Sequence, residues 1–228
     1  MSVTFHSGNL FDSDCQTIVN TVNCVGVMGK GVALVTRLRY PALFAEYQQK
    51  CAAQEIRIGS LWLYKVPQPA PWILNFPTKV HWKDPSRFEY LEKGLTFFLQ
   101  HYIEWGITSI AFPLLGAHNG GLPPIQVKEL MSRYLAQANI RVDVYSFDAR
   151  APDALFSKFK IKWSSLSPAA LRASTGIRQE KQIALITEAL INKRVGSMLD
   201  LVELEGIGLK TLESCFRFTM APQQQTLF

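Results

Sequence analysis

Two asparagines and three glycines stand close together in the segment from Asn20 to Gly31. The apolar pair Ile18–Val19 before it predicts a strand, and the apolar spacing of residues 32–38 after it predicts an amphipathic helix. Glycines let backbone N–H groups approach a phosphate closely, and a helix N-terminus adds partial positive charge. The glycine spacing fits neither the GxGxxG motif nor the Walker motif. The segment therefore predicts an anion-binding loop in a different nucleotide-binding fold.

A candidate catalytic group, Lys79, closes the run Phe76-Pro77-Thr78-Lys79 at the end of a predicted strand. A lysine partly desolvated beside aromatic side chains such as Trp82 has a lowered pKa and can act as a nucleophile. A lysine that stays charged can instead stabilise a departing group. Both roles remain open at this stage, with an ordinary surface lysine as the alternative.

Residues 1–149 alternate between short β-like runs and helical patterns. The predicted strands are Val3–Phe5, Thr17–Val22, Ser60–Val66, Trp72–Phe76, Ser109–Pro113 and Arg141–Phe147. The predicted helices follow Gly31, begin at Pro41, begin at Ser86 with a capping box to Glu89 and a stop at Gly106, and run from Pro124 to Ala138. This alternation predicts a layered α/β domain with a mixed or mostly parallel sheet.

The pattern changes after Asp148. Residues 150–177 are predicted to be a linker, residues 178–220 to be helical, and residues 221–228 to be a flexible tail. Residues 150–228 carry 11 Lys and Arg against 7 Asp and Glu, out of a net charge of +6 for the chain. This excess suggests a part that faces a polyanion, although a solvated helical surface explains it equally well.

Composition narrows the class of protein. A chain of 228 residues with 48% hydrophobic residues can fill a real core. The four cysteines are scattered without a CxxC pair, which favours reduced thiols and argues against a structural zinc site. Because no signal segment or membrane-spanning run is visible, we expect a soluble, cytoplasmic protein. We also expect no bound metal or cofactor.

Five short motifs occur in an order that resembles the macrodomain family, the ADP-ribose-binding α/β/α module. They are Gly8-Asn9-Leu10, Asn20-Thr21-Val22-Asn23, residues 26–31, Phe76-Pro77-Thr78-Lys79 with His81-Trp82, and residues 113–122. The resemblance covers residues 1–149 and is strongest to the branch that contains DNA ADP-ribosyl glycohydrolase antitoxins of the DarG type and the terminal ADP-ribose protein glycohydrolase. It implies a three-layer α/β/α fold with a mixed sheet.

The resemblance also implies site residues. Asn9 and the amide of Leu10 would contact the adenine, although macrodomains usually have Asp at the position of Asn9. Asn23 would face the distal ribose, and Lys79 would be the key catalytic group at the anomeric carbon C1″. The implied ADP-ribose-binding residues are Asn9, Leu10, Asn20, Gly26, Met28, Gly29, Lys30, Gly31, Thr78, Gly116, Ala117, His118, Asn119, Gly120, Gly121 and Leu122.

One departure from the pattern concerns catalysis. The protein-directed relative has an Asp at the position of Pro123 that resolves the lysine intermediate, whereas Leu122-Pro123-Pro124 offers no carboxylate. Three explanations stay open: His118 substitutes as an acid or base, water and substrate groups complete the reaction, or the protein binds without turnover. His81 is a further candidate for positioning the substrate.

Two C-terminal motifs point to partners. Residues 197–213 resemble a helix–hairpin–helix unit, in which the backbone at Gly206 and Gly208 with Lys210 would meet a DNA phosphate. The alternative is a packing αα-hairpin with a glycine turn. Gln224, Leu227 and Phe228 resemble the pentapeptide that binds the bacterial sliding clamp through one amide and two apolar anchors.

These residues lead to one principal function and several rivals. We expect an ADP-ribosyl glycohydrolase that removes ADP-ribose from DNA bases, thymidine in single-stranded DNA foremost, in an antitoxin or repair role. One rival is a non-catalytic ADP-ribose reader that recruits DNA repair or replication proteins. Another is a hydrolase of protein-linked ADP-ribose. A cognate ADP-ribosyltransferase toxin is a further expected partner, and no membrane is expected.

Overall fold

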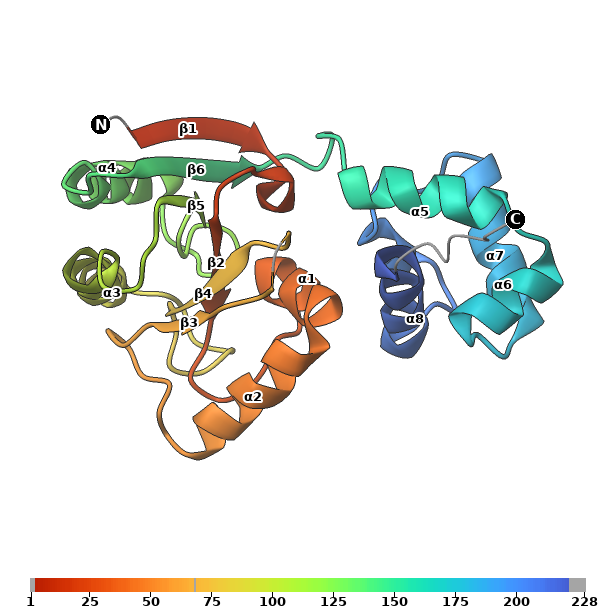
Figure 1. Cartoon of the computed structure of the whole chain (residues 1–228), viewed down its shortest axis with the longest axis horizontal. Helices are drawn as coiled ribbons and strands as arrows, with labels where there is room; N and C mark the ends of the chain where they lie inside the picture. The colour runs from red at the N-terminus through yellow and green to blue at the C-terminus, as the bar shows by residue number, and fades with distance from the viewer. Residues whose placement is uncertain (1–2, 68, 222–228) are drawn as a thin grey trace. The chain divides into compact units, whose positions relative to one another are not determined.

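The computed structural model describes residues 3–67 and 69–221, and the chain divides into two compact units (Figure 1). Unit 1 comprises Met1–Ala151 and unit 2 comprises Pro152–Phe228. The boundary falls two residues from the end of the domain predicted at residues 1–149.

Unit 1 is built on a six-stranded sheet among the described residues. In spatial order the strands are β1 (Val3–Gly8), β6 (Arg141–Phe147), β5 (Ser109–Pro113), β2 (Thr17–Val22), β4 (Trp72–Pro77) and β3 (Trp62–Tyr64). Neighbouring strands are parallel except for β3, which is antiparallel to β4. The sheet is therefore mixed, as predicted, and the five parallel strands end at the same edge.

Two pairs of helices cover the two faces of the sheet (Figure 1). Helices α1 (Gly31–Arg39) and α2 (Pro41–Ala52) pack against the face that carries Ile18 and Ile73. Helices α3 (Phe88–His101) and α4 (Pro124–Leu135) pack against the opposite face, which carries Val19 and Leu74. Successive strand residues point to opposite faces, so adjacent apolar residues supply two separate cores. This confirms the three-layer α/β/α architecture.

Some predicted element ends differ from the structure. The strand predicted over Ser60–Val66 is shorter, and a 3₁₀ turn, η1 (Leu10–Asp12), follows β1. The predicted capping box is wrong, because α3 begins at Phe88 with Arg87 at the N-cap and without a side-chain cap. The buried Ser86 side chain instead packs against the loop that contains Gly116 and Gly120. Tertiary packing thus overrides the local capping preference.

Unit 2 consists of helical elements in the described residues. They are α5 (Ala154–Ser164), α6 (Pro168–Thr175), α7 (Glu180–Ile191), the 3₁₀ turn η2 (Asp200–Glu203) and α8 (Leu209–Met220).

The predicted linker at residues 150–177 is wrong, because these residues form α5 and α6 and bury Trp163 and Leu171. The residues that resembled a linker are helix ends: Ser167 accepts a hydrogen bond from the amide of Ala170 as the N-cap of α6, and Gly176 ends that helix with φ of 73°.

The helices and the cysteines can be compared with the predictions that no segment spans a membrane and that the thiols are reduced. Within residues 3–67 and 69–221, no helix combines the length and the apolar character that a bilayer crossing requires. The four cysteines are free. Burial raises the pKa of the Cys24 thiol to about 11 and that of Cys215 to about 12. Both thiols are therefore protonated near neutral pH, and neither is an activated nucleophile.

Candidate active site

The carboxyl edge of the parallel sheet gathers most of the predicted site residues. Strands β1, β2, β4, β5 and β6 end there. Asn9, Asn23 and Lys79 follow the ends of β1, β2 and β4, and the segment 114–121 follows β5. Ligands of open α/β sheets bind outside the carboxyl ends of the strands. The fold therefore brings together, at one edge, residues that lie up to about a hundred positions apart in the sequence.

Loop one, residues 23–30 between β2 and α1, is held by the side chain of Asn23. Its Oδ1 accepts hydrogen bonds from the amides of Val25 at 3.0 Å and Val27 at 3.3 Å, and its Nδ2 donates to the Val27 carbonyl at 2.6 Å. The buried Tyr47 hydroxyl donates to the Asn23 carbonyl at 2.7 Å. Asn23 therefore sets the path of the loop, and its predicted contact with the distal ribose stays a prediction.

Loop one ends at the N-terminus of α1. Lys30 is the N-cap and contributes no side-chain cap, so the first N–H groups of α1 have no capping side chain. Gly26 and Gly31 adopt φ of 79° and 56°, in the left-handed region that favours glycine. A helix N-terminus whose N–H groups have no capping side chain is suited to binding an anion such as a diphosphate. Loop one thus has the features expected of the predicted phosphate loop.

Loop two, residues 114–121 between β5 and α4, is held by close packing of its backbone. A Cβ on Gly120 would lie 2.2 Å from the Gly116 carbonyl oxygen and 2.4 Å from Ser86 Oγ. The amide of Ser86 donates to the Gly120 carbonyl at 2.9 Å, and the amide of Leu122 donates to the Gly116 carbonyl at 3.0 Å. Glycine is required at position 120 because a side chain has no room there.

The two loops face one another. A Cβ on Gly31, the first residue of α1, would lie 2.8 Å from Asn119 Nδ2 in loop two. The segment after β4 contacts both loops: Lys79 Nζ donates to the Asn119 carbonyl of loop two at 2.5 Å, and the Val80 carbonyl accepts from the Cys24 amide of loop one at 2.9 Å. The structure therefore places loop one, loop two and Lys79 around a common point, which the sequence motifs alone did not fix.

Lys79 is braced through its backbone and partly buried through its side chain. Its carbonyl accepts from the Cys24 thiol at 3.4 Å, and the next carbonyl, of Val80, accepts from the Cys24 amide at 2.9 Å. Burial lowers the pKa of Lys79 below its usual value, while the carboxylate of Asp84 acts in the opposite direction with a smaller effect. The lowered pKa was predicted from neighbouring aromatics; loss of hydration on burial is its main cause.

Several predicted ligand residues support the site with buried side chains. Asn20 is fully buried and donates from Nδ2 to Asn75 Oδ1 at 2.9 Å, so its side chain joins β2 to β4 below the site. The side chains of Leu10, Met28 and Leu122 lie in the two cores. A ligand can therefore reach these residues through their backbone only.

Asn9 and His118 lie at the β1 and β6 end of the edge. Asn9 Oδ1 accepts from the amide of Phe11 at 3.1 Å, so the side chain caps η1. The exposed His118 ring packs edge-on against Phe147 with 5.7 Å between centroids. Contact with adenine for Asn9 and an acid or base role for His118 stay predictions.

Phe147 is a residue that the sequence motifs missed. It ends β6, it is 60% exposed and it lies beside His118 of loop two. An exposed phenylalanine ring at the ligand-binding edge of the sheet can stack on a nucleobase. The available signal was an apolar residue at the last position of a predicted strand, between the polar residues Ser146 and Asp148.

The glycine turn of unit 2 differs in part from a helix–hairpin–helix. The element before it, η2, is a 3₁₀ turn of four residues, whereas the motif predicted an α-helix. Gly208 is the N-cap of α8 without a side-chain cap, and Lys210 lies in the first helical turn. The Gly206 carbonyl accepts from Gln182 Nε2 at 3.0 Å, which fixes the turn on α7. Gln224, Leu227 and Phe228 lie outside the described residues.

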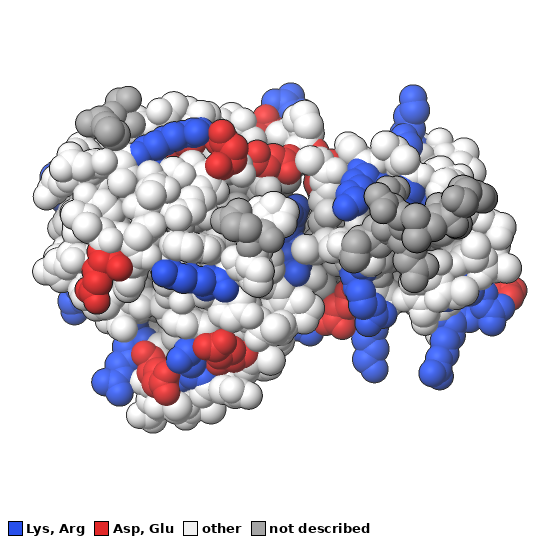
Figure 2. All heavy atoms as spheres, in the orientation of Figure 1, with Lys and Arg blue, Asp and Glu red and all other residues white. Residues whose placement is uncertain are grey.

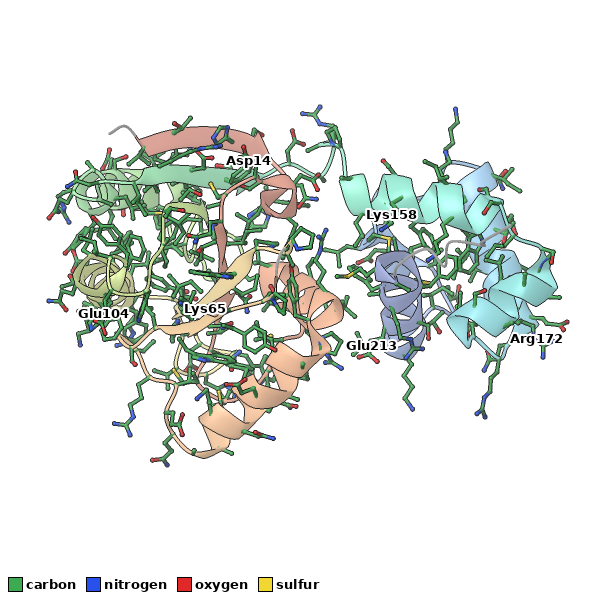
Figure 3. All side chains as sticks on the ribbon, viewed as in Figure 1. Asp14, Lys65, Glu104, Lys158, Arg172 and Glu213 are labelled. Atoms are coloured by element: carbon green, nitrogen blue, oxygen red, sulfur yellow. The ribbon has the colours of Figure 1, made fainter. Side chains whose placement is uncertain are left out.

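A cluster of metal-ligating side chain types lies away from the carboxyl edge, at Asp14, Cys15 and Asp143 (Asp14 is labelled in Figure 3). The guanidinium of Arg141 sits on this cluster, 2.8 Å from Asp14 Oδ1 and 2.6 Å from Asp143 Oδ2. Hydrogen bonds from Arg141 lower the pKa of Asp14. The arginine therefore supplies the positive charge that a metal ion would otherwise bring.

Unit 1 is thus a three-layer α/β/α unit with two facing glycine loops and a lysine at the carboxyl edge of its sheet. The family model described as Macro domain matches residues 19–131, all within unit 1. Unit 1 is similar to the macrodomain of Mycobacterium tuberculosis DarG, at 39% identity and a TM-score of 0.61, covering 63% of this chain and 96% of that one. The chain belongs to the macrodomain family.

Curated relatives carry a more specific name. A protein of Thermus aquaticus called "DNA ADP-ribosyl glycohydrolase" is 44% identical over 144 residues, which are 62% of this chain and 40% of the relative. A protein of the same name from M. tuberculosis is 40% identical over 146 residues, 63% of this chain and 42% of the relative. The chain thus spans about two fifths of the length of these relatives, and the matched share corresponds in size to unit 1.

Proposed function

We propose that this protein is an ADP-ribosyl glycohydrolase that removes ADP-ribose from DNA bases, with thymidine in single-stranded DNA as the substrate. The observation that carries the proposal is the position of Lys79, whose Nζ donates to the Asn119 carbonyl of loop two, opposite the N-terminus of α1. An ADP-ribose with its diphosphate at that helix start would present C1″ to Lys79. The name shared by the 40% to 44% identical relatives supports DNA as the substrate.

Binding precedes chemistry in this proposal. The backbone N–H groups of loop one and the start of α1 would hold the diphosphate, and loop two would close on its other side. Asn23 keeps loop one in place before the ligand arrives. A site organised in advance saves the entropy of ordering and holds the reacting atoms in register.

Two chemical roles fit Lys79. As a neutral amine, Nζ would form a bond to C1″ while the glycosidic bond breaks and its electron pair leaves with the base; water would then release ADP-ribose. As an ammonium ion, Nζ would stabilise charge on the departing base while water attacks C1″. The partial burial of Lys79 makes the neutral form more accessible than in solution.

Substitutions of Lys79 test the proposal and separate the roles. We expect Lys79→Ala to lower the rate of cleavage of an ADP-ribosylated single-stranded oligonucleotide by about a hundredfold or more, with ADP-ribose affinity by calorimetry little changed. Lys79→Arg keeps the charge but removes nucleophilicity. Substantial activity in Lys79→Arg would support the ammonium role, and loss equal to that of Lys79→Ala would support the nucleophile.

The matched control is Lys65→Ala; the residue Lys65 is labelled in Figure 3. Lys65 is exposed and follows β3, whose last residue, Tyr64, pairs with Ile73 near the start of β4, at the opposite end of the sheet from Lys79. Full cleavage by Lys79→Ala together with Lys65→Ala would refute the mechanism. Loss in both variants would point to a general effect of lysine removal.

A non-catalytic reader is the second candidate function. The observation that favours it is Pro123, which is the N-cap of α4 and offers no carboxylate where the protein-directed relative has Asp. Calorimetry with ADP-ribose beside a turnover assay separates the functions, since a reader binds ADP-ribose and releases none from the oligonucleotide. Offering an ADP-ribosylated protein to the same preparation tests the protein-directed alternative.

Partners of the chain follow from unit 2 and from a fused relative. The N-terminus of α8, with Gly206, Gly208 and Lys210, is proposed to bind a DNA phosphate, and Lys210→Ala should then weaken binding of an unmodified oligonucleotide. Unit 2 also presents Lys and Arg side chains, Lys158 on α5 and Arg172 on α6 among them (Figures 2 and 3).

The tail is proposed to bind the sliding clamp, and deletion of residues 224–228 should abolish retention on clamp-coated resin.

A Thermosipho africanus relative, 36% identical over 168 residues, is named a "DNA ADP-ribosyl transferase-DNA ADP-ribosyl glycohydrolase fusion protein". This name supports an ADP-ribosyltransferase toxin as a partner and an antitoxin role for this chain. Inspection of the neighbouring genes for a transferase tests both proposals.

A further inference from the structure

We propose that four exposed apolar side chains beside Lys79 form a stacking surface for a nucleobase of the DNA strand that carries ADP-ribose. They are Val25, Val27, Val80 and Trp82, called here the base platform. The inference rests on the proposed function, because it assigns the acceptor side of the same site. It adds a binding surface for the part of the substrate that is not ADP-ribose.

The four side chains of the base platform are exposed although they are apolar. Val25, Val27, Val80 and Trp82 are 44%, 37%, 47% and 48% exposed. They are half of the eight large apolar side chains that are exposed among the described residues of unit 1, and they come from two short loops. Scattered exposed apolar residues need no explanation, whereas a group of them at a ligand-binding edge marks an interaction surface.

Backbone bonds keep the two loops of the base platform together. The amide of Cys24 donates to the Val80 carbonyl at 2.9 Å, and the amide of Thr78 donates to the Val22 carbonyl at 2.9 Å. Asn23 holds the amides of Val25 and Val27. The amides of Val25 and Val27 and the carbonyls of Val27 and Val80 are therefore hydrogen-bonded within the protein, while the side chains of these three residues are exposed. A fixed apolar surface loses little entropy when a planar base stacks on it.

Position and charge favour a nucleic acid strand as the occupant. Val80 directly follows Lys79 in the chain, and the Cys24 thiol of loop one donates to the Lys79 carbonyl at 3.4 Å, so the backbone of Lys79 lies where the two loops of the base platform meet. Lys83 Nζ lies 5.1 Å from the centroid of the Trp82 ring, and the His81 ring lies 5.5 Å from it. Surfaces that bind single-stranded nucleic acid combine aromatic rings for the bases with cations for the phosphates. Trp82 and Lys83 supply one of each.

Binding measured in a Lys79→Ala background tests the base platform without turnover. The ligands are ADP-ribose and a short single-stranded oligonucleotide with one ADP-ribosylated thymidine. We expect Trp82→Ala to weaken oligonucleotide binding about five- to 150-fold, which is the range of base–aromatic stacking, and to leave the affinity for ADP-ribose within about twofold. Trp82→Phe should recover most of the loss. Ile103→Ala, which removes a 74% exposed apolar side chain from the turn after α3, is the matched control and should change neither affinity.

Several outcomes overturn the base platform. Equal weakening of both ligands by Trp82→Ala would assign Trp82 to the ADP-ribose cleft or to the fold. Unchanged oligonucleotide binding by Trp82→Ala would show that no nucleobase stacks on Trp82. An equal loss with an ADP-ribosylated peptide would show that a nucleobase is not what Trp82 recognises.

Lys83→Ala adds a second readout. It should flatten the dependence of the logarithm of the binding constant on the logarithm of salt concentration by about 0.7, the value for one phosphate contact of a single strand. Because binding is measured without cleavage, a wild-type protein that fails to cleave DNA would refute the proposed function and still leave the base platform open to this test.

Discussion

Loop one and loop two lie at the same edge of the sheet, yet they are held in opposite ways. A side chain holds loop one, since Asn23 bonds the amides of Val25 and Val27 and is itself bonded by Tyr47. Close backbone packing holds loop two, because Gly120 has no side chain and packs directly against the Gly116 carbonyl and Ser86. A loop fixed by hydrogen bonds loses stability in increments when they are removed, whereas a loop fixed by backbone packing fails when one atom is added. Lys79 connects the two loops, because its carbonyl accepts from the Cys24 thiol of loop one and its Nζ donates to the Asn119 carbonyl of loop two.

Gly120→Ala should break loop two with the largest effect. The added Cβ would lie 2.2 Å from a backbone oxygen, which cannot move aside as a flexible side chain can. We expect displacement of the loop on the order of 1 Å and a loss of ADP-ribose affinity on the order of a hundredfold, measured by calorimetry. Gly29→Ala in loop one is the control for folding only, because its Cβ would meet only Val27 Cγ1 at 3.9 Å and should leave the melting temperature unchanged. A melting temperature of Gly120→Ala equal to that of Gly29→Ala, together with wild-type ADP-ribose affinity in Gly120→Ala, would contradict this prediction.

Asn23→Ala should loosen loop one with a smaller effect. It removes the acceptor for two loop amides and the donor to the Val27 carbonyl. We expect a loss of ADP-ribose affinity of about tenfold, as for about 1.4 kcal/mol of lost preorganisation. An effect larger than that of Gly120→Ala would mean that Asn23 touches the ligand directly, as the family resemblance implies.

Asp84→Asn should shift the pH dependence of cleavage that follows from the ionisation of Lys79, the residue that contacts both loops. The Asp84 carboxylate raises the pKa of Lys79, so its removal lowers that pKa further. If neutral Lys79 is the nucleophile, activity rises with pH through this pKa, and the variant gains rate on the acid side. If charged Lys79 is required, the variant loses rate on the alkaline side. A pH profile of cleavage by wild type and variant distinguishes the two, and superimposable profiles would contradict both.

Tyr47→Phe should have the smallest effect. It removes the hydroxyl that donates to the Asn23 carbonyl at 2.7 Å and to Asn23 Oδ1 at 3.2 Å, and it leaves the bonds from Asn23 to Val25 and Val27 in place. We expect a loss of about 0.5–1.5 kcal/mol in unfolding free energy, measured by urea denaturation, and little change in ADP-ribose affinity. A large loss of affinity here would show that loop one depends on its support from α2 more than on Asn23.

The sequence predicted the order and type of most elements of unit 1 because its apolar periodicities are clear. It also singled out Lys79 and both glycine loops from residue types in short motifs; the structure places them at one edge of the sheet, and their roles stay predictions. It was wrong about residues 150–177, where cap residues such as Ser167 and Gly176 are the same residue types that form linkers. It was wrong about Ser86 because packing against loop two outweighs a local capping preference worth about 1 kcal/mol.

The amino-acid sequence by itself determined that this protein has two glycine loops, a lysine after a strand, and strands and helices in an order that yields an α/β/α macrodomain. Local periodicity and turn chemistry act over a few residues and can therefore be seen in the chain. Only the tertiary structure decided that Asn23 holds a loop, that Asn20, Met28 and Leu122 are buried, and that Lys79 meets Asn119. Those relations depend on which strand ends share one edge of the sheet, and parallel pairing across distant segments sets that edge.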